Sequence, residues 1–366
     1  MSQTSAERAD GRLAIPVEGP ARPVVSVIVP VRNEIQTIDR CLAALVDQDY
    51  PRERMEILVV DGMSDDGTPD AVRRRAATAP HIRLLANPRR FAASAMNVGI
   101  AAARGSIIAR VDGHAIVPEH FISACVAALA AHPDVECVSG ATRTLGTGPT
   151  GRAIAAAMCS RIGVGPVRFR LGARSACMVD TVQFPVYRRG ALERVGVFDE
   201  ELVRNQDDEL NLRLRRAGGK ILMLPDADVV YFCRPSLRAL WRQYREYGFW
   251  KIRVMQKHGG PSSWRHLVPG ALVALLAAVP LVLVPGVGRL VEAALAAYAA
   301  LIVVASGLLA VDSGLALWPR IAAALVTLHV AYGVGFWEGV VAFGVPRPGR
   351  STAPCVAPGI PTRAGA

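Results

Sequence analysis

Several polar side chains follow apolar runs early in the chain, at places where they could bind a charged ligand. The runs Val24–Pro30, Met55–Val60 and Ser106–Val111 are typical of buried parallel strands. Ligands of open α/β sheets bind beyond the carboxyl ends of such strands. We therefore expect a single crevice to contain Arg32, Asn33, Glu34, Asp61, Asp66, Asp112 and His114.

The segment VVDGMSDDGT follows the second run and contains two of these acids, Asp61 and Asp66. An aspartate at a strand end could accept charge-assisted hydrogen bonds from a base or a ribose. A plain β-turn explains the same Asp-Gly pairs equally well. The motif alone therefore leaves both interpretations open.

The motif VDGH follows the third run and places His114 two residues after Asp112. In extended geometry this spacing turns both side chains to one face. A carboxylate and an imidazole suit a divalent cation bound to a diphosphate, either Mn²⁺ or Mg²⁺, and the imidazole favours Mn²⁺. A structural histidine beside an aspartate is the competing explanation.

Three acids in NQDDELNLRLRRAGG stand where a helix is predicted to begin: Asp207, Asp208 and Glu209. The helix dipole favours carboxylates at this end, so capping alone could account for them. A buried carboxylate here could instead act as a general base. Glu209 is expected either to cap this helix or to pair with Arg213 at i+4.

Alternating strands and helices from Val24 to Ala131 predict βαβ units, and therefore an α/β fold with a parallel sheet and right-handed connections. From Gly140 to Arg189 the pattern is weaker and rich in glycine and arginine. We assign that stretch to the acceptor side of the site, with a mobile loop over 163–176.

Three apolar stretches late in the chain are long enough to span a membrane: 267–288, 293–311 and 321–345. The basic and aromatic segment 234–266 before them predicts an interfacial membrane helix, with an ordinary amphipathic core helix as the alternative. Its positive charge places the preceding domain in the cytoplasm. Three spans would put the later arginines, Arg347, Arg350 and Arg363, on the other side, unless one segment is re-entrant.

The composition of the 366 residues agrees with a membrane-associated protein. A net charge of +11 favours an anionic membrane surface, and the absence of a nucleic-acid motif argues against a nucleic-acid partner. Seven scattered cysteines without a CxxC pair fit a reducing compartment. Residues 1–22 lack the apolar core of a signal peptide and are predicted to be a mobile tail.

Five elements occur in an order that resembles the inverting family 2 glycosyltransferases of GT-A fold: VIVPVRNE, VVDGMSDDGT, NPRRFAASAMNVGIAAARG, VDGH and NQDDELNLRLRRAGG. The resemblance extends over about Val24 to Lys257 and is nearest to the membrane-associated, succinoglycan-biosynthesis-like exopolysaccharide branch. It implies a GT-A (Rossmann-like, mostly parallel sheet) catalytic domain over 23–233. The interfacial segment 234–266, about three transmembrane helices within 267–346 and a tail over 347–366 would follow.

By this resemblance the nucleotide pocket contains Pro30, Arg32, Glu34, Asp61, Asp66, Arg90, Asn97 and Asp112. Asp112 is the first acid of the family's D-x-D metal motif, and His114 stands where the last acid usually is. Asp207 matches the catalytic base of the family's E-D pair, and Gln206 replaces the glutamate. The residues after Gln243 depart from the Q-x-x-R-W motif of processive synthases, which disfavours processivity.

The implied reaction moves a hexose, with inversion, from a nucleotide sugar (a UDP-sugar by expectation) to a lipid-linked sugar acceptor in exopolysaccharide or cell-surface glycan biosynthesis. Mn²⁺ or Mg²⁺ is the implied cofactor. A multi-pass protein of the inner (plasma) membrane with a cytoplasmic catalytic domain is expected. The alternatives are a processive polysaccharide synthase, a polyprenyl-phosphate glycosyltransferase and, from another class, a non-catalytic membrane scaffold. The substitutions His114 and Gln206 favour the scaffold, whereas the retained Asp61, Asp112 and Asp207 argue against it.

Overall fold

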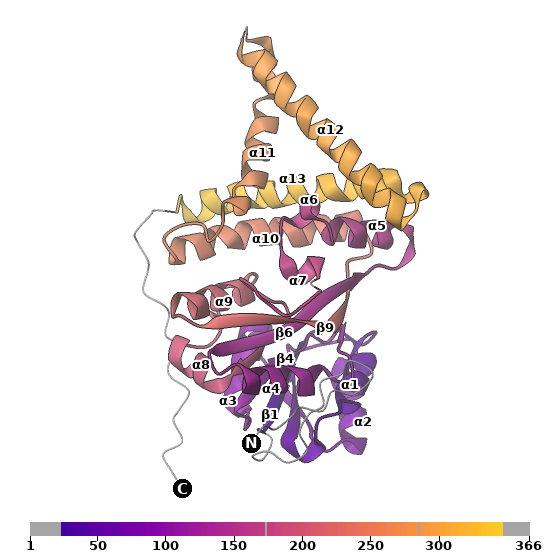
Figure 1. The fold of residues 1–366 in the computed structure, drawn as a ribbon, viewed down its shortest axis with the longest axis vertical. Coiled ribbons are helices and arrows are strands. Elements are labelled where there is room, and N and C mark those ends of the chain that lie inside the picture. Colours follow the sequence, from indigo (N-terminus) through magenta and orange to yellow (C-terminus); the bar gives the residue numbers. More distant parts are fainter. Residues whose placement is uncertain (1–22, 173, 285, 347–366) are drawn as a thin grey trace, which may run out of the picture.

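The computed structural model describes residues 23–172, 174–284 and 286–346. In this part of the chain one mixed sheet has the order β3-β2-β1-β4-β8-β6-β9-β5, with β7 paired to β9. Figure 1 shows this sheet and its helices on one side of the molecule, and two long helices, α10 and α13, above them. The predicted tails, 1–22 and 347–366, lie outside the described residues.

The first half of the sheet is parallel, as the sequence predicts. It consists of β1 (Val25–Val31), β2 (Met55–Asp61), β3 (Ile82–Ala86) and β4 (Ile107–Arg110). The connecting helices are α1 (Ile38–Val46), α2 (Thr68–Thr78) and α3 (Ala92–Ala102). Successive residues of β1 enter opposite cores, because Val27 and Val29 belong to the cluster with α1 whereas Ile28 belongs to the cluster with α3.

The second half of the sheet is mixed rather than parallel. Its strands are β5 (Ala115–Ile116), β6 (Val135–Leu145), β7 (Cys177–Met178), β8 (Val186–Arg188) and β9 (Lys220–Phe232). Strand β8 runs antiparallel between β4 and β6, while β6 and β9 are parallel. The helices of this half are α4 (Phe121–Ala131), α5 (Gly148–Met158), α6 (Arg161–Val164), α7 (Arg168–Leu171), α8 (Arg189–Val195) and α9 (Gln206–Arg216).

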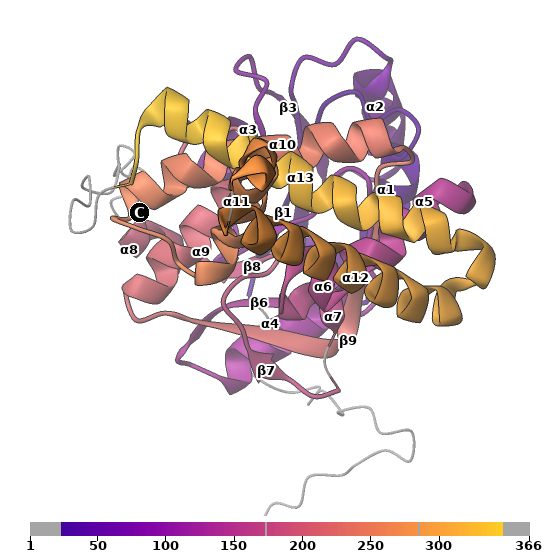
Figure 2. The same ribbon diagram turned by 90° about the horizontal axis from the view of Figure 1, so that it is seen from above.

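Helix α10 (Leu237–Lys257) lies between the sheet and α13 (Trp318–Phe343), and in both views α13 runs along it (Figure 1, Figure 2). The two backbones approach closely because glycines of α13 meet α10. An added Cβ at Gly335 would lie 1.9 Å from the carbonyl oxygen of Arg245. The Arg245 Nε atom donates to Glu338 of α13 at 2.7 Å. Helix α13 therefore covers one face of the segment that the sequence predicts to be interfacial. On that face α10 behaves as the amphipathic core helix of the alternative prediction.

The apolar stretches form a hairpin and one lateral helix. The stretch 267–288 does not form one long helix. It contains the ten-residue α11 (Val268–Ala277) and the 3₁₀ helix η3 (Val279–Leu283), whose second residue is a proline. The hairpin of α11, η3 and α12 (Val287–Ser313) projects away from the sheet (Figure 1). In the described residues two helices are long and apolar enough to cross a membrane, Val287–Ser313 and Leu315–Phe343.

Gly335→Ala tests the contact between α10 and α13. The added methyl would collide with the α10 backbone, so we expect the thermal midpoint in detergent to fall, with a loss of about 1–3 kcal/mol of stability. Gly307→Ala is the matched control, since its nearest neighbour would be a Trp318 ring atom at 3.7 Å. Equal midpoints for the two variants would show that this contact does not limit stability.

Candidate active site

Three loops meet at the carboxyl edge of the parallel half-sheet. Val31 pairs in register with Asp61, so β1 and β2 end side by side. At Gly62 a Cβ would lie 3.3 Å from both the Arg32 Cβ and the Arg90 carbonyl oxygen. The structure thus brings together the loops that carry Arg32, Asp61 and Arg90, all of which the sequence assigns to the nucleotide pocket.

Asp61 has a carboxylate oxygen without a partner. This residue ends β2 and is only 8% exposed. Its Oδ2 atom accepts a hydrogen bond from the Ser64 backbone N–H at 3.1 Å. The Oδ1 atom is buried and has no hydrogen-bond partner among the described residues. A buried unpaired acceptor costs free energy. A hydroxyl or N–H of a bound ligand would remove that cost.

Other predicted pocket residues have their polar atoms occupied within the protein. Asp66 accepts from Thr68 and from the Ile35 backbone N–H at 3.0 Å. Burial acts to raise the pKa of Asp66, but these hydrogen bonds outweigh it and lower the pKa. Asn97 binds the Phe198 backbone and Glu200. A direct nucleotide contact of Asp66 or Asn97 stays a prediction.

Two further members of the predicted crevice, Asn33 and Pro30, shape the loop after β1. Asn33 has a φ of 57° and accepts a hydrogen bond from the Asp65 backbone N–H at 3.1 Å. Pro30 lies in β1 opposite Val60. Asn33 thereby ties the loop after β1 to the loop after β2.

His114 lies in a turn rather than in the extended geometry that the sequence predicts, and Glu34 fixes the position of its ring. Residues after β4 form a turn, and the His114 Nδ1 atom lies 2.8 Å from Glu34 Oε1. Burial acts to lower the pKa of His114, but Glu34 and Asp112 outweigh it and raise the pKa. A carboxylate on one ring nitrogen is the usual partner of a metal-binding histidine. This contact leaves His114 Nε2 as the atom that could bind a cation.

The donor atoms present fit a divalent cation shared with a diphosphate. Asp112 uses Oδ1 to accept from Arg110 at 2.8 Å, and among the described residues neither Asp112 Oδ2 nor His114 Nε2 has a hydrogen-bond partner. The described residues contain no group of three or more His, Cys, Asp or Glu that could hold a metal by themselves. Mg²⁺ is commonly held by one or two carboxylates together with substrate phosphates, so two protein ligands suffice.

Arg110 is a site residue that the motif analysis missed. Its side chain is 6% exposed, and its guanidinium binds Asp112 through Nε and Asp207 through Nη1. A cation in the otherwise apolar strand SIIARV was the available signal, because buried charges are almost always paired. One guanidinium thus joins the predicted metal ligand to the predicted base.

Asp207 is the second residue of α9, and one of its carboxylate oxygens accepts a hydrogen bond from Arg110. Burial raises the pKa of Asp207 to about 6; the Arg110 charge opposes this shift and the Asp112 charge adds to it. A carboxylate with a pKa near the working pH is well suited to general-base catalysis. The raised pKa is therefore compatible with general-base catalysis by Asp207, which stays a prediction.

Comparison with known proteins identifies the family of this chain. The model of the family described as glycosyl transferase family 2 matches residues 26–196. The succinoglycan biosynthesis protein ExoA of Rhizobium meliloti is 30% identical over 87% of this chain and 95% of its own length. The chain belongs to glycosyl transferase family 2. It is a nucleotide-sugar-dependent glycosyltransferase, so the scaffold alternative is not supported.

Two further proteins are similar to this chain. The dolichyl N-acetyl-alpha-D-glucosaminyl phosphate 3-beta-D-2,3-diacetamido-2,3-dideoxy-beta-D-glucuronosyltransferase of Methanococcus voltae is 27% identical over 64% of this chain and 74% of its own length. The mannosyltransferase PcManGT of Pyrobaculum calidifontis, solved with GDP-Man and Mn²⁺, is 27% identical with a TM-score of 0.56, covering 87% of this chain and 88% of its own. The predicted GT-A fold is confirmed, with a mixed sheet.

The other two acids of this family 2 site have structural partners. Glu209 pairs with Arg213 as predicted, at 2.8 Å, and also lies 3.0 Å from His258 Nε2. Burial acts to raise the pKa of Asp208, but the buried Lys251 of α10 outweighs it and lowers the pKa. Neither carboxylate is therefore as available for a proton as Asp207.

Proposed function

We propose that this enzyme moves a hexose, with inversion, from a nucleotide sugar to a lipid-linked sugar acceptor in exopolysaccharide or cell-surface glycan biosynthesis. The observation that carries this proposal is the bridge made by Arg110. It places a free oxygen of the strand-end Asp112 and the raised-pKa carboxylate of Asp207 on two sides of one guanidinium. A donor diphosphate and an acceptor hydroxyl would meet between them.

The proposed reaction is a single displacement at the anomeric carbon. Asp207 removes the proton from an acceptor hydroxyl as that oxygen forms its bond to the anomeric carbon. The bond from this carbon to the diphosphate oxygen breaks, and the nucleoside diphosphate leaves with the electron pair. Attack from the face opposite the leaving group inverts the configuration. The Arg110 charge keeps Asp207 ionised near neutral pH, because it opposes the rise in its pKa.

Asp112 and His114 would hold Mn²⁺ or Mg²⁺. When bound, such a cation offsets negative charge that develops on the diphosphate. Support comes from the Pyrobaculum mannosyltransferase, which was solved with Mn²⁺ and a nucleotide sugar. Its donor is GDP-Man, so a panel of donors must include GDP-sugars beside the UDP-hexoses that we expect.

A multi-pass position in the inner membrane, with the sheet in the cytoplasm, would bring this site to a lipid acceptor. The two candidate spans support membrane association. The name of the Methanococcus relative describes a dolichyl-linked phosphate, which supports a lipid-linked acceptor here. All six cysteines of the described residues are free thiols, in keeping with a cytoplasmic domain.

The proposal is tested by incubating membranes that contain the enzyme with labelled UDP- and GDP-sugars and then extracting lipids. We expect one donor to label the lipid fraction by a single sugar, and Asp207→Asn membranes to show almost no label. Label in long polymer would instead indicate a processive synthase. Label on a bare polyprenyl phosphate would indicate the polyprenyl-phosphate glycosyltransferase alternative.

Glu34→Gln tests the role of Glu34 behind the metal ligand. Removal of a carboxylate that orients a metal-bound histidine typically costs about 10- to 100-fold in metal affinity. We expect this loss in calorimetric titrations of Mn²⁺ in the presence of UDP, and it should exceed any loss of UDP affinity measured in the absence of metal. Glu53→Gln, on the exposed η1 turn (Arg52–Arg54), is the control. Wild-type Mn²⁺ affinity in Glu34→Gln would remove His114 from the metal site.

A further inference from the structure

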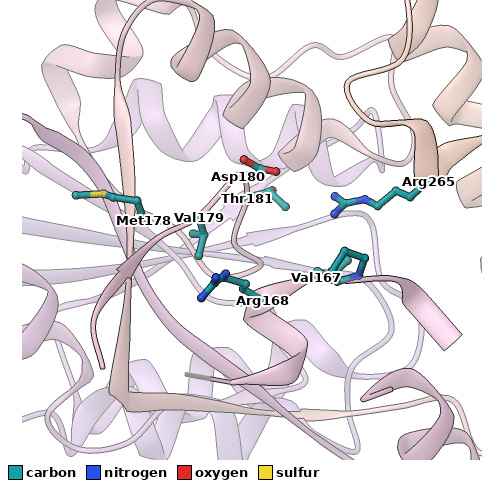
Figure 3. Close-up of a pocket in the computed structure, with 8 residues that line it drawn as sticks. Val167, Arg168, Met178, Val179, Asp180, Thr181 and Arg265 are labelled. Carbon is teal, nitrogen blue, oxygen red and sulfur yellow. The ribbon is translucent and has the colours of Figure 1, made fainter. Parts of the chain in front are cut away.

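A pocket of about 130 Å³ opens between α7, β7 and the foot of the apolar hairpin, away from the residues assigned to the nucleotide. Figure 3 shows Arg265 extending into it toward Asp180 and Thr181, from the side opposite Met178. The lining residues are Pro166, Val167, Arg168, Met178, Val179, Asp180, Thr181 and Arg265.

The pocket contains two arginine charges that the protein leaves unpaired. Within the described ranges no carboxylate lies at ion-pair distance from Arg168 or Arg265. The Arg168 guanidinium contacts Cys177 Sγ at 3.9 Å, and Arg265 Nε lies 3.5 Å from His266 Nε2. Asp180, the acid of the lining, is paired with Arg215 at 3.1 Å. The net charge presented to a ligand is therefore positive, and guanidinium groups bind phosphate oxygens well.

The pocket lies close both to the apolar hairpin and to the helix that carries the proposed base. Arg265 belongs to η2 (Trp264–His266), directly before α11, and the neighbouring Trp264 is 75% exposed. A smaller adjoining pocket shares Asp180 and Arg265 and extends to Asp208, the residue after Asp207. Arg265 thus lies between Asp208, which is next to the proposed base, and the start of the apolar hairpin.

We propose that Arg168 and Arg265 bind the phosphate or diphosphate that links the acceptor sugar to its polyprenyl chain. This inference rests on the proposed function and adds the subsite that holds the acceptor. With the anionic linkage in the pocket, the prenyl chain can lie along the apolar hairpin while the sugar extends toward Asp207. The donor diphosphate binds elsewhere, because none of Asp61, Asp112 and His114 lines this pocket.

The test uses the full chain in detergent, titrated with geranylgeranyl diphosphate. We expect Arg265→Gln and Arg168→Gln each to weaken this binding by about 10- to 100-fold, the loss typical of a charge-assisted contact. Arg265→Lys should recover part of it. Arg74→Gln removes one charge from the exposed face of α2 and should leave binding unchanged. UDP affinity, measured in every variant, reports whether the nucleotide site remains folded.

Three comparison ligands separate the possible sources of binding. Geranylgeraniol lacks phosphate and should bind weakly and equally to all variants. Inorganic pyrophosphate should bind weakly, and its affinity should fall with the arginine substitutions. Phosphatidylglycerol should not compete with geranylgeranyl diphosphate. Wild-type affinity in both glutamine variants, alcohol binding as tight as the diphosphate, or competition by phosphatidylglycerol would each overturn the subsite. Absence of labelled lipid product from the wild type would overturn the proposed function, whatever the titrations show.

Discussion

Asp207→Asn is expected to abolish almost all sugar transfer while leaving donor binding near normal. The substitution keeps the size of the side chain and can still meet Arg110, but it removes the proton acceptor. Loss of a general base typically costs about 10²–10⁴-fold in rate. Transfer to the labelled lipid product gives kcat, and calorimetric titration with the nucleotide gives the donor affinity.

Asp208→Asn is the matched control, one residue along the same helical turn. Its carboxylate pairs with Lys251, so this variant should lose stability more than chemistry, with a smaller fall in kcat. A dead Asp208→Asn beside an active Asp207→Asn would move the base to Asp208. Equal and partial losses in both variants would show that neither carboxylate accepts the proton alone.

Arg110→Gln is expected to move the pH dependence of transfer and to lower the rate strongly. Wild-type kcat/KM should rise with pH through about 6, because the base must lose its proton and the pKa of Asp207 is raised to about 6. Arg110 opposes that rise, so its removal raises the pKa of Asp207 further and moves the rising limb to higher pH. Without the cation, two part-buried carboxylates also lose their partner, so we expect a loss of stability as well.

Arg110→Lys and Arg83→Gln complete the series. Lysine keeps the charge but has one compact head, which cannot meet Asp112 and Asp207 with separate nitrogens as a guanidinium does. We expect an intermediate rate with the rising limb near that of the wild type. Arg83 of β3 pairs with the buried Glu56 of β2, and loss of Arg83 should leave the pH profile unchanged. If the rising limb of the pH profile of kcat/KM stays at the wild-type pH in Arg110→Gln, Arg110 does not control the ionisation of Asp207.

The sequence predicts the parallel half of the sheet and the place of the site with good accuracy, because these follow from local pattern. Strands β1 and β2 are continuous apolar runs, and the polar residues after them must meet at one edge. The pair Glu209–Arg213 follows from helical spacing alone and is confirmed. The mixed half of the sheet was less accessible, since β8 is a short strand inserted between β4 and β6 by long-range pairing.

What the sequence leaves open are contacts between residues far apart in the chain. Asn97 is occupied by the backbone of Phe198, and Arg110 meets Asp207 across 97 positions. Nothing in local periodicity reports such partners. For the same reason the basic face of α10 suggests a membrane surface, although α13 covers part of that helix. Burial of an amphipathic helix depends on which later segment returns to it.

The contact between α10 and α13 has a consequence for how the enzyme is made in the cell. Arg245 and Glu338 are 93 positions apart, and the hairpin of α11 and α12 is synthesised between them. A nascent chain therefore exposes the apolar face of α10 until the hairpin has found its place and α13 can return. Proteases and chaperones recognise such exposed faces. A chain in which α13 fails to return to α10 would therefore be a target for both.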